Sequence, residues 1–189
     1  MREVHIKKKQ DLYFEWRHFQ LEEAKNTDGL NMKIWDKKDL TVTKSLLASV
    51  CAESAKLQGK ILFERFHFEL LNARHNSYPR LQLNDFNELL NIAIDVGLDK
   101  KKFINDFNNI QMLKNVEKDH NIAVEKYGVF GTPTLVFENN KSVFIKTFIP
   151  KNMKDSILFF DYLIKIFRDM PFVGELKRPQ PPWPKGVNK

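Results

Sequence analysis

Thiol chemistry is the first possibility to weigh, because the 189-residue sequence contains a single cysteine, Cys51. In dithiol exchange one thiolate attacks and a second thiol resolves the mixed disulfide, so one cysteine cannot complete the cycle. A single cysteine also excludes an intramolecular disulfide and a zinc site with two thiolates. Cys51 falls on an apolar helical stripe, where cysteine is usually an inert small hydrophobe. We therefore assign no catalytic residue.

The histidines and carboxylates show no spacing typical of a catalytic or metal-binding site. His120 lies on an apolar helical stripe and is predicted to be a core residue. His67 and His75 are eight residues apart, too far for ligands on adjacent turns of one helix. The sequence has no glycine-rich phosphate motif and no carboxylate pair typical of acid–base catalysis. We therefore predict no metal site and no cofactor.

The most informative stretch is GVFGTPTLVF, residues 128–137. Two glycines and a proline lead into an apolar, β-rich run, which predicts a tight turn followed by a buried strand. Pro133 has no backbone N–H and belongs at the first position of that strand. The Thr132–Pro133 bond is a candidate for a cis peptide, although only about 5% of X–Pro bonds in folded proteins are cis.

Hydrophobic periodicity predicts the order strand, several helices, hairpin, helix. Residues 12–19 alternate at period 2, and their apolar content on both faces predicts a strand covered on both sides. From about residue 41 to 127 the pattern is helical. Five helices are expected in this range. The first two cover residues 41–58, followed by Gly59, and 61–74; the third is capped by Asn84, the short fourth by Asp99, and the longer fifth ends before Gly128. Strands over 134–138 and 142–148 flank a turn at 139–141, and a closing helix is expected near Pro150.

Several segments carry a family resemblance. The stretch at 128–137 is similar to the cis-proline loop of the DsbA-like branch of the thioredoxin fold. Segments 15–22, 33–35, 63–67 and 175–179 resemble, in order, the FrnE and 2-hydroxychromene-2-carboxylate isomerase type of that branch. The resemblance implies an α/β, thioredoxin-like fold that is incomplete at the N-terminus and carries an inserted all-helical subdomain. The implied domains are a thioredoxin-like part at 1–36 and 128–176, the helical subdomain at 37–127, and a proline-rich tail at 177–189.

The resemblance also implies a site. In the family the proline loop lies beside a CxxC motif and holds the backbone of the substrate, and the bond before the proline is cis. The residues carried over as substrate-binding are Gly131, Thr132 and Pro133 of the loop, together with His18 and Trp35. The ligand expected in this groove is a peptide or a low-molecular-weight thiol. For His18, a structural role is the favoured alternative.

The chain departs from the family pattern at one decisive place. The central strand and the CxxC motif that follows it are missing, so we expect the chain to be redox-inactive. Without that strand, the strands at 12–19 and 134–138 would carry unpaired edges. The two strands can pair directly, a partner chain can supply a strand, as in a homodimer, or the native protein can be longer than this sequence. The last possibility is the expectation we favour.

Composition argues against nucleic-acid binding and against a membrane-spanning protein. The formal charge of +7 and the pI of about 9.4 suggest an anionic partner, but 24 acidic residues are interspersed with 31 basic ones. Nucleic-acid binding through the lysine clusters at 7–9 and 100–102 and the basic tail therefore ranks last. No run approaches the roughly 18 apolar residues of a membrane span, and no apolar signal core follows Met1, so we expect a cytoplasmic protein. Two alternatives remain: a relative of the DsbA-like oxidoreductases, and a non-catalytic module that binds a peptide or glutathione. Glutathione is included because the kappa-class glutathione transferases share this architecture.

Overall fold

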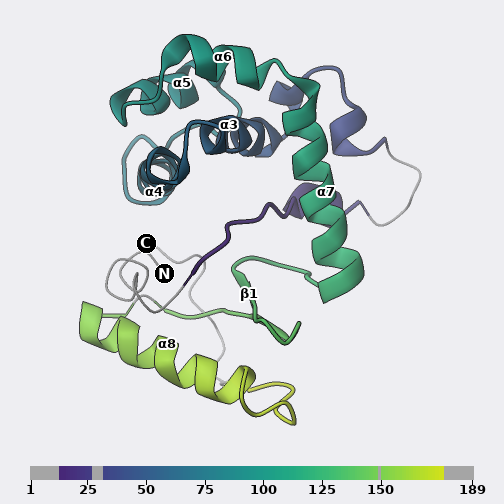
Figure 1. The fold of residues 1–189 in the computed structure, drawn as a ribbon, viewed down its shortest axis with the longest axis vertical. Helices are drawn as coiled ribbons and strands as arrows, with labels where there is room; N and C mark the ends of the chain where they lie inside the picture. Colours follow the sequence, from purple (N-terminus) through teal and green to yellow (C-terminus); the bar gives the residue numbers. More distant parts are fainter. Residues whose placement is uncertain (1–12, 27–31, 149, 177–189) are drawn as a thin grey trace. The chain divides into compact units, whose positions relative to one another are not determined.

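The computed structural model describes residues 13–26, 32–148 and 150–176 (Figure 1). The chain forms two compact units, each described separately below. The helical unit comprises residues 17–122, and the hairpin unit comprises residues 1–16 and 123–189. The lysine cluster at 7–9 and the tail at 177–189 lie outside the described residues. In the described part of the chain, no helix is both long enough and apolar enough to cross a membrane.

The helical unit is built around helix α3, Leu46–Lys56, which contacts α4, α5, α6 and the 3-10 turn η2. Small residues such as Ala52 and Cys51 let neighbouring helices approach α3 closely, and nine of its eleven residues are buried. The predicted stripe is therefore confirmed, but burial extends almost all the way around the helix. The other elements are α2 Leu21–Ala24, η1 Ile34–Asp36, η2 Leu40–Val42, α4 Lys60–His75, α5 Phe86–Asp95, α6 Lys100–Phe107 and α7 Ile110–Tyr127.

The helix starts in this unit follow capping chemistry. Asp99 caps α6 as predicted, and its carboxylate accepts a hydrogen bond from the Lys102 N–H at 2.7 Å. The prediction that Asn84 caps α5 is wrong by one residue, because Asp85 accepts from the N–H groups of Asn87 and Glu88. An aspartate and an asparagine cap equally well, so sequence alone does not separate the two adjacent candidates. The start of α3 also differs: η2 occupies residues 40–42, so the helix begins at Leu46 and not near residue 41.

The hairpin unit contains the only sheet among the described residues, a pair of antiparallel strands. Strands β1, Thr134–Val136, and β2, Ser142–Phe144, pair with Leu135 opposite Val143. Asn140 in the connecting turn has φ of 61°, as expected for an asparagine in a tight hairpin. Both strands are shorter than predicted. The last turn of α7 belongs to this unit, and the residue after the helix, Gly128, has φ of 62°.

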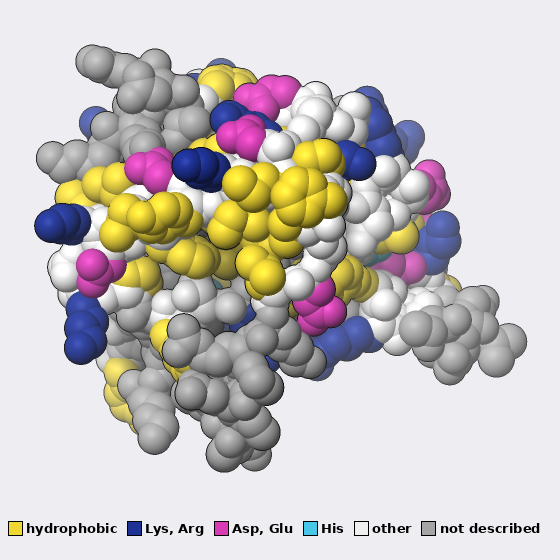
Figure 2. Space-filling view, turned by 90° about the horizontal axis from the view of Figure 1, so that it is seen from below, with side chains coloured by type: hydrophobic (Ala, Val, Ile, Leu, Met, Phe, Trp, Pro, Cys, Tyr) yellow, Lys and Arg dark blue, Asp and Glu magenta, His cyan; other side chains and the backbone are white. Residues whose placement is uncertain are grey.

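Helix α8, Met153–Phe167, follows the hairpin and is capped by Asn152, whose side chain accepts from the Asp155 N–H at 2.9 Å. The predicted start at Pro150 is therefore wrong by three residues. One face buries Phe160 and Leu163, but the opposite face leaves apolar side chains exposed. Figure 2 shows a face on which apolar side chains gather. On α8 the exposed large apolar residues are Met153, Leu158, Phe159 and Tyr162.

The prediction of a strand over residues 12–19 is wrong for the described part of that segment. Residues 13–20 are extended and still alternate in burial, but none belongs to a strand, and Tyr13 is 78% exposed. Backbone groups that a neighbouring strand would satisfy bond instead to side chains of α7. The N–H of His18 donates to Asp119 Oδ2 and the N–H of Gln20 to His120 Nδ1, each at 3.1 Å. These two alternate N–H groups are thereby satisfied without a sheet.

Candidate functional site

The proline loop of the hairpin unit lies between the end of α7 and strand β1. Thr132 and Pro133 are exposed, and the peptide bond between them is cis. Thr134 Oγ1 donates to the Gly131 carbonyl at 2.7 Å, and the Ile145 N–H donates to the Pro133 carbonyl at 3.0 Å. The hairpin therefore fixes the backbone on both sides of Pro133 while its ring faces outward.

Gly131 is packed so closely that a side chain would not fit. A Cβ at this position would lie 2.9 Å from the Phe144 ring, well inside normal contact distance. That ring packs in turn against Phe130, with ring centroids 5.0 Å apart. Phe130 itself is 72% exposed. The glycine is thus required by close packing, and the loop displays an aromatic ring beside Thr132 and Pro133 in the sequence.

Strand β1 offers an edge next to this loop. Hydrogen bonds from Ile145 to Pro133 and from Phe137 to Lys141 set which residues face β2. In an antiparallel ladder the residues between them, Thr134 and Val136, direct their N–H and C=O groups away from the partner strand. No other described strand pairs with β1. An extended segment could therefore pair with β1 beside the loop.

Cys51 has none of the features of a reactive thiol. It is fully buried in α3, and burial raises the pKa of its thiol well above the ordinary range. A thiol with a raised pKa stays protonated at neutral pH, whereas nucleophilic cysteines are partly exposed and have a lowered pKa. Cys51 is therefore a packing residue, in agreement with its position on the predicted stripe.

His120 is also a core residue, as predicted. It is 4% exposed, stacks on Phe19 with ring centroids 5.0 Å apart, and accepts the Gln20 N–H at Nδ1. Because Nδ1 is an acceptor, the proton of the neutral ring is assigned to Nε2. Burial lowers the pKa of His120 below the ordinary value of a histidine. Gln20 is buried with it, and its side-chain amide donates to Ser49 Oγ at 2.7 Å.

One polar cluster in the helical unit has no counterpart in the sequence patterns. His18 Nε2 lies 3.0 Å from Glu53 Oε1, and Asp119 accepts from the His18 N–H. Two cations face these carboxylates: Arg17 lies 2.8 Å from Asp119 Oδ1, and Lys56 pairs with Glu53. Burial alone would raise the pKa of Glu53, but the hydrogen bonds and charges of His18 and Lys56 outweigh it and lower the pKa to about 2. We call His18, Glu53 and Asp119 the acidic–histidine cluster.

Sequence reasoning missed this cluster because its members lie far apart in the chain. Glu53 is on α3, Asp119 on α7 and His18 on the extended segment, and no local spacing connects them. The only signal was a carboxylate on each of two apolar helix faces. A charge on the buried side of a helix needs a partner, because an unpaired buried charge is very costly.

The five residues predicted to bind substrate divide between the two units. Gly131, Thr132 and Pro133 belong to the hairpin unit, whereas His18 and Trp35 belong to the helical unit. Trp35 is 7% exposed and packs in a core cluster with Ile34, Leu46, Val50, Met112 and Val116. His18 bonds to Glu53, as the structural alternative expects. A substrate role for these five residues stays a prediction.

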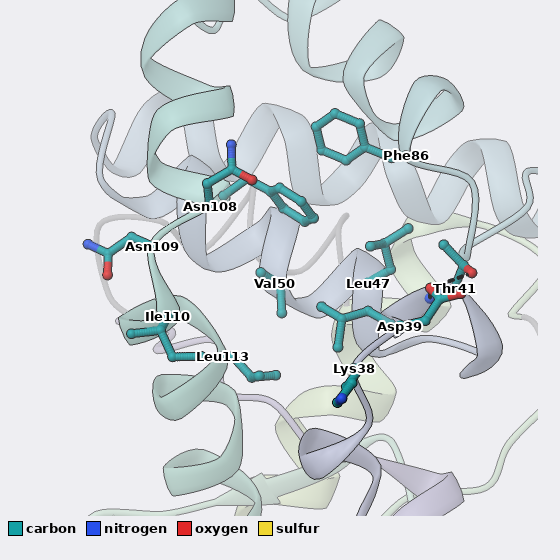
Figure 3. A pocket seen from close by; sticks show the side chains of 12 residues that line it. Lys38, Asp39, Thr41, Leu47, Val50, Phe86, Asn108, Asn109, Ile110 and Leu113 are labelled. Carbon is teal, nitrogen blue, oxygen red and sulfur yellow. Dashed lines mark hydrogen bonds between the residues drawn. The ribbon is translucent and has the colours of Figure 1, made fainter.

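A separate open cleft of about 400 Å³ lies within the helical unit (Figure 3). Its apolar lining includes Leu47 and Val50 of α3, Leu113 of α7 and two phenylalanines, Phe86 and Phe107, and Asn108 and Asn109 add amide groups. Asp39 at its edge is tied to Thr41 by hydrogen bonds to both the N–H and the hydroxyl. No cysteine or histidine lines the cleft. It offers apolar and amide contacts and the charged side chains of Lys38 and Asp39, but no thiol or imidazole.

Comparison with known proteins gives two findings. The family model of the DSBA-like thioredoxin domain matches residues 2–156. The ClpXP adapter protein SpxH of Bacillus subtilis (strain 168) is 28% identical over 137 residues. That match covers 71% of this chain and 44% of the relative, so the chain spans less than half of the length of this curated protein.

Proposed function

The chain belongs to the DsbA-like thioredoxin family of thiol–disulfide oxidoreductases, and we propose that it works without dithiol exchange, as a module that holds an extended segment of a partner protein at its proline loop. Its fold supports this assignment: a largely helical chain with a two-stranded antiparallel sheet is a partial thioredoxin fold with a helical insertion.

The observation that carries the proposal is the state of the cysteine. The 189 residues contain one thiol, and it is buried with a raised pKa. A disulfide cycle needs an accessible thiolate and a resolving thiol. Neither requirement is met by Cys51, so the residues of this chain support binding and not redox turnover.

The proline loop supplies the features that binding needs. Thr132, Pro133 and the Phe130 ring are exposed. In the adjoining strand β1, the backbone N–H and C=O groups of Thr134 and Val136 point away from β2. An extended peptide that adds to a sheet edge gains backbone hydrogen bonds, and neighbouring apolar side chains provide specificity. The exposed apolar residues of α8 give the same unit further surface of the kind that protein partners cover.

The similarity to SpxH agrees with a protein-binding role, because that relative is described as an adapter protein. By analogy we propose that this chain binds another protein. The finer expectations, a FrnE-like subtype and a cytoplasmic location, remain part of the proposal. A glutathione-like thiol at the same loop is the alternative ligand, and the test below separates it from a peptide.

The first experiment measures redox turnover. The purified chain should not accelerate the reduction of insulin by dithiothreitol, and Cys51→Ala should behave like the wild type. Turnover above the uncatalysed rate that disappears in Cys51→Ala would overturn the redox-inactive part of the proposal.

The second experiment measures binding at the loop. Twelve-residue peptides selected from a display library against the whole chain are labelled, and their affinities are measured by fluorescence anisotropy. Pro133→Ala, which removes the exposed ring and frees the backbone φ, should weaken binding at least roughly tenfold. Pro79→Ala, in a turn of the helical unit, is the matched control and should leave the affinity unchanged. Equal affinity of both variants would remove the loop from the proposal, and displacement by millimolar glutathione would favour the thiol ligand.

A further inference from the structure

The acidic–histidine cluster brings three potential metal ligands together from three parts of the helical unit. One ligand atom from each of His18, Glu53 and Asp119 lies within 4.8 Å of the other two. The side chains of Glu53 and Asp119 are 9% and 6% exposed, and that of His18 is 14% exposed. Carboxylates are seldom this deeply buried unless they are paired with cations or coordinate metals.

The distances are close to those a small cation needs. Zinc binds histidine nitrogen and carboxylate oxygen at about 2.0–2.2 Å, so ligand atoms around it lie roughly 3–4 Å apart. His18 Nε2 and Glu53 Oε1 are already 3.0 Å apart. Drawing the Asp119 carboxylate inward by about an ångström would complete three ligands, and water would fill the remaining position.

The surrounding contacts hold two of these ligands in place. Asn115 and Asp119 are one turn apart on α7, and the Asn115 amide donates to Glu53 Oε2 at 3.2 Å. The His18 N–H donates to Asp119 Oδ2, which orients that carboxylate. Hydrogen bonds of this kind around metal ligands fix their orientation and raise metal affinity.

The charges that now balance the carboxylates sit on the solvent side. The Arg17 side chain is 56% exposed and that of Lys56 is 28% exposed, whereas their carboxylate partners are buried. Both cations have long flexible side chains whose charged ends can reach water, although Lys56 also lies over the Phe63 ring. A divalent cation would therefore compete with two solvent-side charges and not with a fully enclosed ion pair.

We propose that His18, Glu53 and Asp119 form a binding site for a transition-metal dication such as Zn²⁺. The bound ion would clamp residues 17–20 of the extended segment onto α3 and α7, within the helical unit. The imidazole ligand sets the selectivity: zinc and cobalt accept nitrogen donors readily, whereas Ca²⁺ and Mg²⁺ prefer oxygen ligands. The competing possibility is that Arg17 and Lys56 already complete a self-contained ion-pair network.

The test uses the full chain, stripped of metal with EDTA and then titrated with Zn²⁺ by calorimetry and with Co²⁺ by visible absorption. We expect one Zn²⁺ per chain, Co²⁺ absorption bands that Zn²⁺ removes, and no competition from Ca²⁺ or Mg²⁺. The ligand variants His18→Asn, Glu53→Gln and Asp119→Asn should each weaken binding at least roughly tenfold. His75→Gln, an exposed histidine on α4, is the matched control and should bind like the wild type.

The double variant Arg17→Ala/Lys56→Ala tests the competition between these cations and the metal ion, whereas wild-type binding separates the two possibilities. If the cluster is a metal site, removing the competing charges should tighten Zn²⁺ binding roughly tenfold or more. This variant leaves two buried carboxylates without these cations, so circular dichroism first checks that it folds, and the wild-type titration decides the proposal independently of it. No saturable wild-type binding below roughly 10 μM, or unchanged affinity in the double variant, would overturn the proposal.

Discussion

The two units of this protein differ in what they bury and what they expose. Among the described residues, every buried polar or charged side chain belongs to the helical unit, including Gln20, Glu53, Asp119 and His120. The buried side chains of the hairpin unit are apolar, such as Val143 and Phe160. Conversely, all exposed phenylalanines of the described chain lie in the hairpin unit, at positions 130, 148, 159 and 172.

This difference indicates a division of tasks. Buried polar groups that are fully hydrogen-bonded specify one arrangement of a core, because any other arrangement leaves them unsatisfied. Exposed aromatic rings do not specify a fold, but they supply much of the binding energy at protein interfaces. The helical unit therefore has the character of a precisely arranged scaffold, and the hairpin unit that of a contact surface.

The largest effect is expected from matched phenylalanines in the two units. Phe103 of α6 is fully buried and packs against Phe66, with ring centroids 5.9 Å apart. Phe103→Ala should lower the free energy of unfolding by about 3–5 kcal/mol. Phe159→Ala, at a 43% exposed position on α8, should cost about 1 kcal/mol or less. Urea denaturation measures both, and equal costs would contradict the distinction between scaffold and contact surface.

A second comparison uses two arginine–aspartate pairs. Asp119 is buried and accepts hydrogen bonds from the Arg17 guanidinium and the His18 N–H. Asp119→Ala should therefore lower the free energy of unfolding by about 3 kcal/mol. Asp169 pairs with Arg168 on the surface of the hairpin unit, and Asp169→Ala should leave the free energy of unfolding nearly unchanged. Chemical denaturation at neutral pH in 0.15 M salt gives both values. A cost below 1 kcal/mol for Asp119→Ala would show that the cluster does not hold the extended segment.

Acid should destabilise the helical unit through His67 of α4. Burial, followed by the nearby charges of His18 and Lys56, lowers the pKa of His67 to about 4. Below pH 6.5 the unfolded chain takes up a proton that the folded chain does not, so stability falls as the pH drops toward 4. From pH 7 to pH 5 the loss should be about 2 kcal/mol.

The measurement for His67 is urea unfolding at a series of pH values. His67→Gln should remove most of this pH dependence, whereas His75→Gln, at a more exposed position of the same helix, should remove little. An unchanged slope in His67→Gln would assign the acid sensitivity to other groups.

The smallest predicted stability effect tests the close packing of the proline loop. Gly131→Ala would bring a methyl group against the Phe144 ring and should cost at least about 1 kcal/mol. Gly174→Ala, where no atom lies within 4 Å of the new Cβ, is the matched control and should be neutral. Peptide affinity should fall in Gly131→Ala but not in Gly174→Ala. Equal stability of the two variants would mean that the ring moves aside freely.

Local signals in the sequence predicted most helices of this fold. The Asp99 cap, the apolar stripe of α3 and the asparagine turn at Asn140 all depend on neighbours within a few residues, and each is confirmed. The prediction of a strand at 12–19 is wrong because strand pairing depends on residues far away in the sequence. Period 2 predicts an extended backbone correctly, but whether that backbone joins a sheet depends on what lies beside it. Here Asp119 and His120, about a hundred residues later, take the place of a strand.

The candidate sites divide in the same way. The proline loop is contiguous, so GVFGTPTLVF located it without the structure. The acidic–histidine cluster is assembled from positions 18, 53 and 119, and no spacing rule connects a residue before α2 with residues on α3 and α7. Burial was the missing quantity: the sequence places Glu53 and Asp119 on apolar helix faces, but it does not show that the packing of both helices brings them together.

The burial of Cys51 also makes the protein a convenient host for chemical labels. A maleimide dye should not react with the native wild type, so a cysteine introduced at a surface position such as Lys154 would carry the label alone. The same burial makes Cys51 a probe of local unfolding. Its slow modification by a thiol reagent occurs only when the helices around α3 separate, so the rate reports how often the helical unit opens under native conditions.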